Sequence, residues 1–312
     1  MTVARQQPAT GARPAARLSA KRREAIAGYL FVLPDAAGLL VFIGLPMLLA
    51  FVISTFDVDG FGNFRFAGAA NYMRMWKDPL FWQSFRVTVL FAVMLVPALY
   101  VTGLGLALLV QRNGRFNSIV RAMFFAPQMV SLVVVALVWQ LMVVDKLGIL
   151  TRILGFFGIT GLSLLGDPNL ALFTVTAAAT WFLMGFYMLI FLGGLQDIPR
   201  EYYEASIIDG AGPIQNFWYI TLPLLRPTSF FVLLVSVVTA VAGAQVFDLV
   251  YVITKGGPAN STSLLINYIY QQAFQYSAFG YAAAMATLLV VILMAVTVVL
   301  FLLTRGGRFQ YD

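Results

Sequence analysis

The chain has 312 residues, of which 61% are hydrophobic and only 11% are charged, and its formal net charge is +7. About a quarter of the residues in a soluble domain are charged, so this composition excludes a soluble, disordered, collagen-like or coiled-coil protein and predicts an all-α polytopic membrane protein. The chain contains no cysteine and no histidine, which excludes disulfides, thiolate metal sites and imidazole bases. We therefore expect no metal site and no catalytic residue.

Residues 1–25, rich in Ala, Arg, Pro and Gln, cannot bury enough apolar surface to fold, so we predict a disordered tail there and a single transmembrane domain over residues 26–312. Six apolar runs in this domain are each long enough to cross a bilayer core, which needs about 20 residues. None alternates polar and apolar residues as a barrel strand does, so six transmembrane helices are predicted. The runs are approximately Leu30 to Phe56, Val87 to Val110, Met123 to Val144, Leu170 to Leu195, Phe230 to Thr254 and Ala282 to Leu303.

The distribution of positive charge indicates the orientation of these helices. Lys and Arg number 13 in the two termini and the loops on their side, against 7 in the loops on the other side. The positive-inside rule then places both termini in the cytoplasm. The excess positive charge is expected to face anionic lipid, and no nucleic-acid partner is predicted.

The loop between the fourth and fifth runs, at about residues 196–229, is too long for a simple connection. Pro199 suits a helix start, Gly210 can adopt the left-handed conformation that ends a helix, and Pro213 suits the start of a second short helix. The first helix is amphipathic. Amphipathicity alone favours a helix lying in the headgroup layer, and periodicity does not separate this from a helix that docks into a cytoplasmic partner.

The same loop contains Glu204-Ala205-Ser206, then Asp209-Gly210, then Ile220-Thr221-Leu222-Pro223, and this spacing resembles the EAA loop of permease subunits in binding-protein-dependent ABC importers. Ser206 stands where the motif has a second Ala. The segments GLGLALLVQRNGRF, RAMFFAPQ and FDLVYVITKGGPANST are similar to the carbohydrate branch of these permeases, of the maltose and glycerol-3-phosphate types. The resemblance covers nearly the whole chain from residue 27 onward.

This resemblance implies the type I importer permease fold and a loop that contacts a cytoplasmic ATPase. The ATPase-coupling residues it implies are Glu204, Ala205, Ser206, Asp209, Gly210, Ala211, Ile220, Leu222 and Pro223. Two alternatives stay open, because Asp209 could cap the turn instead of meeting a partner and Leu222 could serve in packing.

The resemblance also implies a substrate route lined by the fourth and fifth spans, where sugars need rings for stacking and polar groups for their hydroxyls. The candidates are Trp181, Phe182, Phe186, Tyr187, Thr239, Gly243, Gln245 and Asp248. Lipid contact or helix packing is the alternative for each aromatic residue, and a structural pair is the alternative for Asp248. Gln245 is the favoured contact, since an amide inside an apolar span tends to face protein or water.

The partners implied are a second homologous permease, two ATPase subunits that bind ATP and Mg²⁺, and an extracytoplasmic sugar-binding protein, in a bacterial or archaeal cytoplasmic membrane. The chain contains no GxxxxGK[ST] phosphate-binding loop, so ATP hydrolysis must come from other chains and no cofactor is expected in this one. An ion-coupled secondary transporter is the alternative, but it would call for acid/base pairs or a repeat within the spans, and the sequence has neither. The cargo stays open among disaccharides, oligosaccharides and glycerol phosphate.

Overall fold

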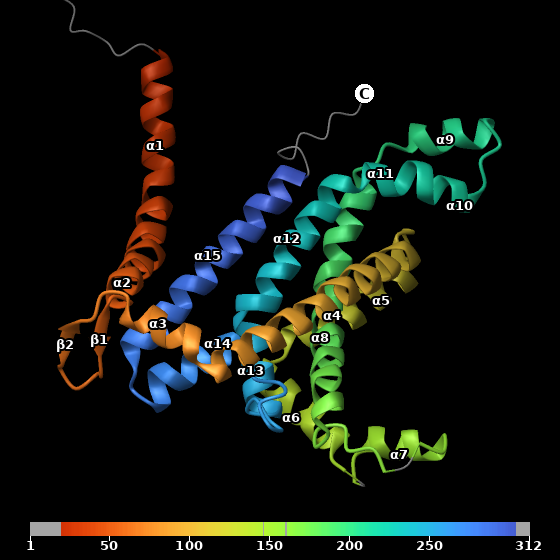
Figure 1. Cartoon of the computed structure of the whole chain (residues 1–312). Coiled ribbons are helices and arrows are strands. Elements are labelled where there is room, and N and C mark those ends of the chain that lie inside the picture. Colours follow the sequence, from red (N-terminus) through yellow and green to blue (C-terminus); the bar gives the residue numbers. More distant parts are fainter. Residues whose placement is uncertain (1–19, 146, 160, 304–312) are drawn as a thin grey trace, which may run out of the picture. The chain divides into compact units, whose positions relative to one another are not determined.

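The computed structural model describes residues 20–145, 147–159 and 161–303 (Figure 1). The predicted tail lies mostly outside these ranges. The part of it that is described, residues 20–25, belongs to helix α1 (Ala20–Leu39). Contacts divide the chain into two compact units with a boundary after Ala50, and each is described by itself.

The first unit is a single apolar helix. It consists of α1, a π-helical turn (Leu40–Gly44) and the beginning of α2 (Leu45–Ile53). Large apolar side chains are exposed along its length, including Phe31 at 88% and Phe42 at 80%. A helix that is hydrophobic on all sides and unburied by protein requires lipid around it, so the first predicted span is confirmed as a helix of membrane-spanning length over Glu24–Ile53.

Three unbroken helices of the second unit are also long and apolar enough to span a membrane: α4 (Pro79–Val110), α8 (Pro168–Gln196) and α15 (Phe279–Leu303). Two of them begin with the same Asp-Pro dipeptide. Asp78 accepts a hydrogen bond from the Leu80 N–H at 2.9 Å, and Asp167 accepts one from the Asn169 N–H at 2.8 Å. Each proline occupies a first-turn position where no donor is needed, so both helix starts are fixed by local chemistry.

The third and fifth predicted spans are not straight helices. The third is α5 (Arg115–Phe125), a 3₁₀ turn (Ala126–Met129) and α6 (Leu132–Val143), bent by 98°. The fifth is divided into α12 (Arg226–Ala242) and α13 (Ala244–Ile253). The described residues hold four candidate spans, or up to six when two bent pairs each count as one: α5 with α6, and Pro213–Leu224 with α12, which are bent by 67°.

The remaining elements lie in the connections. A two-stranded antiparallel hairpin of β1 (Phe56–Val58) and β2 (Phe64–Phe66), which the sequence did not predict, follows the first span. The short helices are α3 (Ala70–Lys77), α7 (Ile149–Phe156), α9 (Arg200–Ile208), α10 (Pro213–Asn216), a π turn (Phe217–Thr221), α11 (Leu222–Leu224), α14 (Leu265–Tyr270) and a second π turn (Gln271–Gln275).

The core of the second unit forms where α4 packs against α8 and α12, and where α13 packs against α6. Its centre contains the fully buried Phe91, Leu95 and Phe191. The Tyr100 and Ser229 hydroxyls, 2.9 Å apart, join α4 to α12. Within this unit α9 and α10 lie at one end of α8 and α7 lies at the other, so the long loop with the recognisable motif projects from one end of the helix bundle (Figure 1).

Candidate functional site

The loop that carries the motif is a folded pair of short helices, here called the coupling hairpin (residues 199–224). Helix α9 ends at Ile208, and the chain turns at Gly210, whose φ of +79° favours glycine. The Ala211 N–H donates to the Ser206 carbonyl at 2.9 Å, and Pro213 opens α10. The predicted helix start, turn and second helix are therefore confirmed.

Polar contacts fix the conformation of the coupling hairpin, one of them between its two helical segments. The Tyr203 and Thr221 hydroxyls lie 3.0 Å apart and join α9 to the π turn. The Gln215 amide oxygen accepts a hydrogen bond from the Gly212 N–H at 2.9 Å, at the start of α10. This loop thus has a defined conformation of its own, and Tyr203 faces inward instead of toward a membrane surface.

The structure separates the predicted coupling residues by their exposure. Ser206 is only 8% exposed and donates to the Tyr203 carbonyl at 2.7 Å, so in the single chain it faces the interior of the hairpin. Leu222 packs against the core of the bundle, which favours its packing role. Ala211, Ile220 and Pro223 are half-buried, whereas Glu204, Ala205, Asp209 and Gly210 are exposed.

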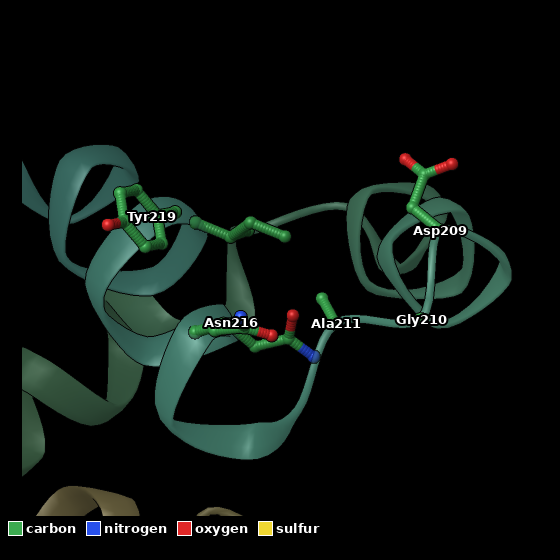
Figure 2. A pocket seen from close by; sticks show the side chains of 7 residues that line it. Asp209, Gly210, Ala211, Asn216 and Tyr219 are labelled. Carbon is green, nitrogen blue, oxygen red and sulfur yellow. The ribbon is translucent and has the colours of Figure 1, made fainter.

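The Asp209 carboxylate is directed away from Gly210 and Ala211, as Figure 2 shows. It accepts no hydrogen bond from the described residues, although its own N–H donates to the Ala205 carbonyl at 3.0 Å. A side chain that capped the turn would bond to a backbone N–H. The structure therefore does not support the capping alternative, and it leaves this carboxylate free for a partner.

The surface of the coupling hairpin is unusually apolar for a segment outside the bundle. Ile208 is 86% exposed, Tyr219 79% and Ile214 75%. A notch of about 290 Å³ lies in the turn between α9 and α10, with Tyr219 and Asn216 on one side of it (Figure 2). The Asn216 side-chain oxygen has no hydrogen-bond partner among the residues that the structure describes. Large exposed apolar side chains on a short segment outside the bundle are typical of a protein-binding surface.

The fifth span is interrupted at Gly243, one of the predicted pathway residues. Its N–H still bonds to the Thr239 carbonyl at 3.0 Å, but its ψ of 129° ends α12, and α13 starts at the next residue. A Cβ at this position would lie 2.4 Å from the Thr239 carbonyl oxygen, so only glycine fits the break. The sequence signal was a glycine inside an apolar run, which commonly marks a local departure from the regular helix.

Four predicted pathway residues reach the surface of the single chain. Trp181, Phe186 and Gln245 are exposed, and Asp248 is half-buried. Within the described ranges the Gln245 amide makes no hydrogen bond and the Asp248 carboxylate makes neither a hydrogen bond nor an ion pair. The structural pair considered for Asp248 is therefore not seen in this part of the chain. Gln245 lies two residues after the Gly243 break, and its side chain is exposed on the surface of the bundle.

The other pathway candidates pack within the single chain. Phe182 is 4% exposed and Tyr187 only 1%, because both lie on the face of α8 that is buried in the core. The Tyr187 hydroxyl donates to Thr239 Oγ1 at 3.3 Å and so joins α8 to α12. Their burial favours the packing alternative in the single chain, and the Tyr187 hydroxyl also engages Thr239, so their place on the substrate route stays a prediction.

A polar cluster that the sequence analysis missed lies at the end of the unit opposite the coupling hairpin. Asp78 Oδ2 accepts hydrogen bonds from the Tyr268 and Tyr281 hydroxyls, both at 2.6 Å. Burial by itself would raise the pKa of the Asp78 carboxyl, but these bonds and those from the Leu80 and Phe81 N–H groups outweigh burial and hold its pKa below the ordinary value of 3.8. Asp78 is therefore an anion that fixes the starts of α4 and α15 to α14.

Comparison with known proteins gives consistent matches over most of the chain. A family model described as "binding-protein-dependent transport system inner membrane component" matches residues 99–306. The trehalose/maltose transport system permease protein MalF of Thermococcus litoralis is 35% identical over 94% of this chain and 97% of its own length. The lactose transport system permease protein LacF of Rhizobium radiobacter is 36% identical over the same shares.

Among solved structures, the chain resembles one from a bacterial alginate ABC transporter in complex with a periplasmic protein bound to an alginate pentasaccharide. The TM-score is 0.78 at 18% identity, over 91% of this chain and 96% of the other. At that identity the likeness concerns the fold alone. It agrees with the predicted fold class.

Proposed function

The chain belongs to the family of binding-protein-dependent transport system inner membrane components, and we propose that two of its surfaces have separate roles in transport. It is a membrane-embedded permease of a carbohydrate ABC importer and not an enzyme. Neither the described residues nor the relatives named above support an ion-coupled transporter. The coupling hairpin binds to the ATPase, and the surface around Gln245 contacts the sugar.

The exposed apolar surface of the coupling hairpin is the observation that carries this proposal. Ile208 and Tyr219 would be costly to leave in water, since burying one such side chain is worth about 1.5–3 kcal/mol. Glu204 is exposed on the same hairpin, where it can meet an arginine or backbone donors of a partner. Together these exposed apolar and acidic side chains suit a projection that inserts into a cleft of a cytoplasmic ATPase.

The assembly we propose contains this chain, a second homologous permease, two ATPase subunits and an extracytoplasmic binding protein. The ATPase subunits bind ATP and Mg²⁺, because this chain has no phosphate-binding loop of its own. Both termini lie on the cytoplasmic side of a bacterial or archaeal membrane, as the Lys and Arg distribution predicts. The coupling hairpin then also lies in the cytoplasm, on the side of the ATPase.

We propose that the sugar passes along the surface around Gln245, between this chain and the second permease. Gln245 precedes the end of α13 by eight residues, which is about 12 Å along the helix and therefore near the middle of a core of about 30 Å. An amide at that depth without a partner needs sugar, water or a polar neighbour. Trp181 and Phe186, exposed on α8, are the aromatic residues that fit stacking on a sugar.

Charge reversal on α9 tests the coupling assignment. Glu204→Lys should fold and insert normally, because the side chain is exposed, yet sugar uptake by the assembled transporter should fall at least tenfold, since the new cation repels the groups that the carboxylate meets. Glu201→Lys is the matched control, with the same charge change on the same helix outside the motif. Equal uptake and equal ATPase stimulation in the two variants would reject the assignment.

A further inference from the structure

A cavity of about 550 Å³ lies at the end of the second unit opposite the coupling hairpin. It opens between the start of α4, helix α3, the loop at 255–264 and the π turn that follows α14, and it is called here the outer pocket. Its lining includes Arg74, Ser84, Gln271, Gln272 and Tyr276. A volume of this size falls within the range of about 300–1,000 Å³ that holds ligands as large as a disaccharide.

The lining of the outer pocket is mainly polar. Amide groups come from Gln271, Gln272 and Asn260, and hydroxyl groups come from Ser84 and Ser263, whose oxygens lie 3.3 Å apart. These groups offer donors and acceptors side by side, as a polyhydroxylated ligand requires.

An aromatic ring and a cation complete this lining. The Tyr276 ring is 66% exposed, and it is the kind of surface on which the C–H face of a sugar stacks. The Arg74 guanidinium lies 4.2 Å from the centre of the Tyr281 ring and makes no ion pair with any described residue. A cation held over a ring keeps its N–H groups available to a ligand. Because Tyr281 is bonded to Asp78, the arginine rests on the part of the unit that the carboxylate fixes in place.

We propose that the outer pocket is a sugar subsite, which holds one or two units of the cargo before it enters the pathway at Gln245. This inference rests on the proposed function, because it takes the cargo to be a carbohydrate. A protein partner fits the pocket less well. Protein-binding surfaces are centred on exposed apolar anchors, as on the coupling hairpin, whereas this cavity is concave and mostly lined by amides and hydroxyls.

Gln271→Ala and Tyr276→Ala test the subsite, and Phe274→Ala is the matched control, since Phe274 lies on the same π turn and is 67% exposed but does not line the cavity. The assembled transporter is reconstituted in vesicles with its binding protein. Trehalose, maltose, lactose and glycerol 3-phosphate are the probes, and whichever the wild type imports is used for the variants. Uptake and the affinity of the binding protein for the transporter are measured in parallel, and thermal unfolding checks that all three variants are folded.

Each pocket variant should lower uptake by about three- to tenfold, as the loss of one or two sugar contacts predicts, while the binding protein docks with unchanged affinity. Uptake equal to that of Phe274→Ala overturns the subsite and leaves the proposed function intact. Weakened docking of the binding protein overturns it as well, because the pocket would then be a protein contact. A wild type that takes up neither these probes nor any other sugar that its binding protein binds contradicts the proposed function, and the subsite with it.

Discussion

The coupling hairpin and the outer pocket sit at opposite ends of the same helix bundle and are built in opposite ways. The hairpin exposes large apolar groups such as Ile208 and Tyr219 and has only a few polar contacts of its own. Around the outer pocket, the Asp78 carboxylate accepts hydrogen bonds from two tyrosines, and polar groups line the cavity. Exposed apolar surface is removed from water by a protein partner, whereas fixed polar groups around a cavity suit a small hydrophilic ligand.

The largest effect should come from placing a charge on the apolar surface of the hairpin. Ile208→Asp should reduce copurification of the ATPase subunits at least tenfold, because the interface loses about 1.5–3 kcal/mol of apolar burial and must also desolvate a carboxylate. The permease itself should remain folded, since Ile208 is 86% exposed. Phe61→Asp, at a position 85% exposed on the hairpin between β1 and β2, is the control and should leave ATPase binding unchanged.

At the other end, Asp78→Asn should destabilise the chain itself by about 1–3 kcal/mol at neutral pH, because two hydrogen bonds to a charged, partly exposed acceptor are weakened. Thermal unfolding in detergent measures this loss. The pKa of Asp78 is lowered in the folded state, so its contribution is complete above the ordinary value of 3.8 and is lost as the pH falls through the lower folded pKa. The difference between wild type and variant should therefore shrink at pH 3, and a constant difference would contradict this account.

A smaller effect is expected at the break in the fifth span, between the two regions. Gln245→Leu should lower uptake by about two- to tenfold through lost hydrogen bonds to sugar, worth roughly 0.5–1.5 kcal/mol each, without changing assembly. Gln196→Leu, at the last residue of α8, is the control with the same side-chain change. A complex structure in which the Gln245 amide bonds only within its own bundle would contradict the sugar contact.

Single cysteines give a direct test of which end lies inside the cell. The native chain has none to confuse labelling. Cysteines at the exposed Ser118 and Asp209 should react with membrane-impermeant reagents only from the cytoplasm, and one at Asn63 only from outside. Cysteines at Ser206 and Ser263 should react slowly from either side, because both positions are buried. Labelling of position 209 from outside in intact cells would reverse the orientation.

The sequence predicts best those features that depend on neighbours along the chain. Pro199, Gly210 and Pro213 act through their own backbones, so the two helices and the turn of the coupling hairpin could be predicted. The long apolar runs predict helices for the same reason, since every backbone group in lipid must be satisfied within its own segment.

Features that depend on contacts between residues far apart in the sequence could not be predicted from it. Tyr268 and Tyr281 lie 190 and 203 positions from Asp78, so no local pattern could reveal the cluster. The same limit applies to Ser206 and Tyr187, because periodicity gives the spacing of side chains but not which face of a helix its neighbours cover. The Gly243 break had a local signal, but the apolar run on both sides of it favoured a continuous helix.

The interruption at Gly243 also determines which parts of the bundle can move as one. Helix α12 packs mainly against α4, while α13 packs mainly against α6. The Asn267 side-chain amide donates to the Phe247 carbonyl at 3.3 Å and so links α13 to α14. Helix α14 is also held to α4 by the bond from Tyr268 to Asp78, so a change in the backbone dihedrals of Gly243 would tilt α13 and α6 while α12 and α14 stay on α4.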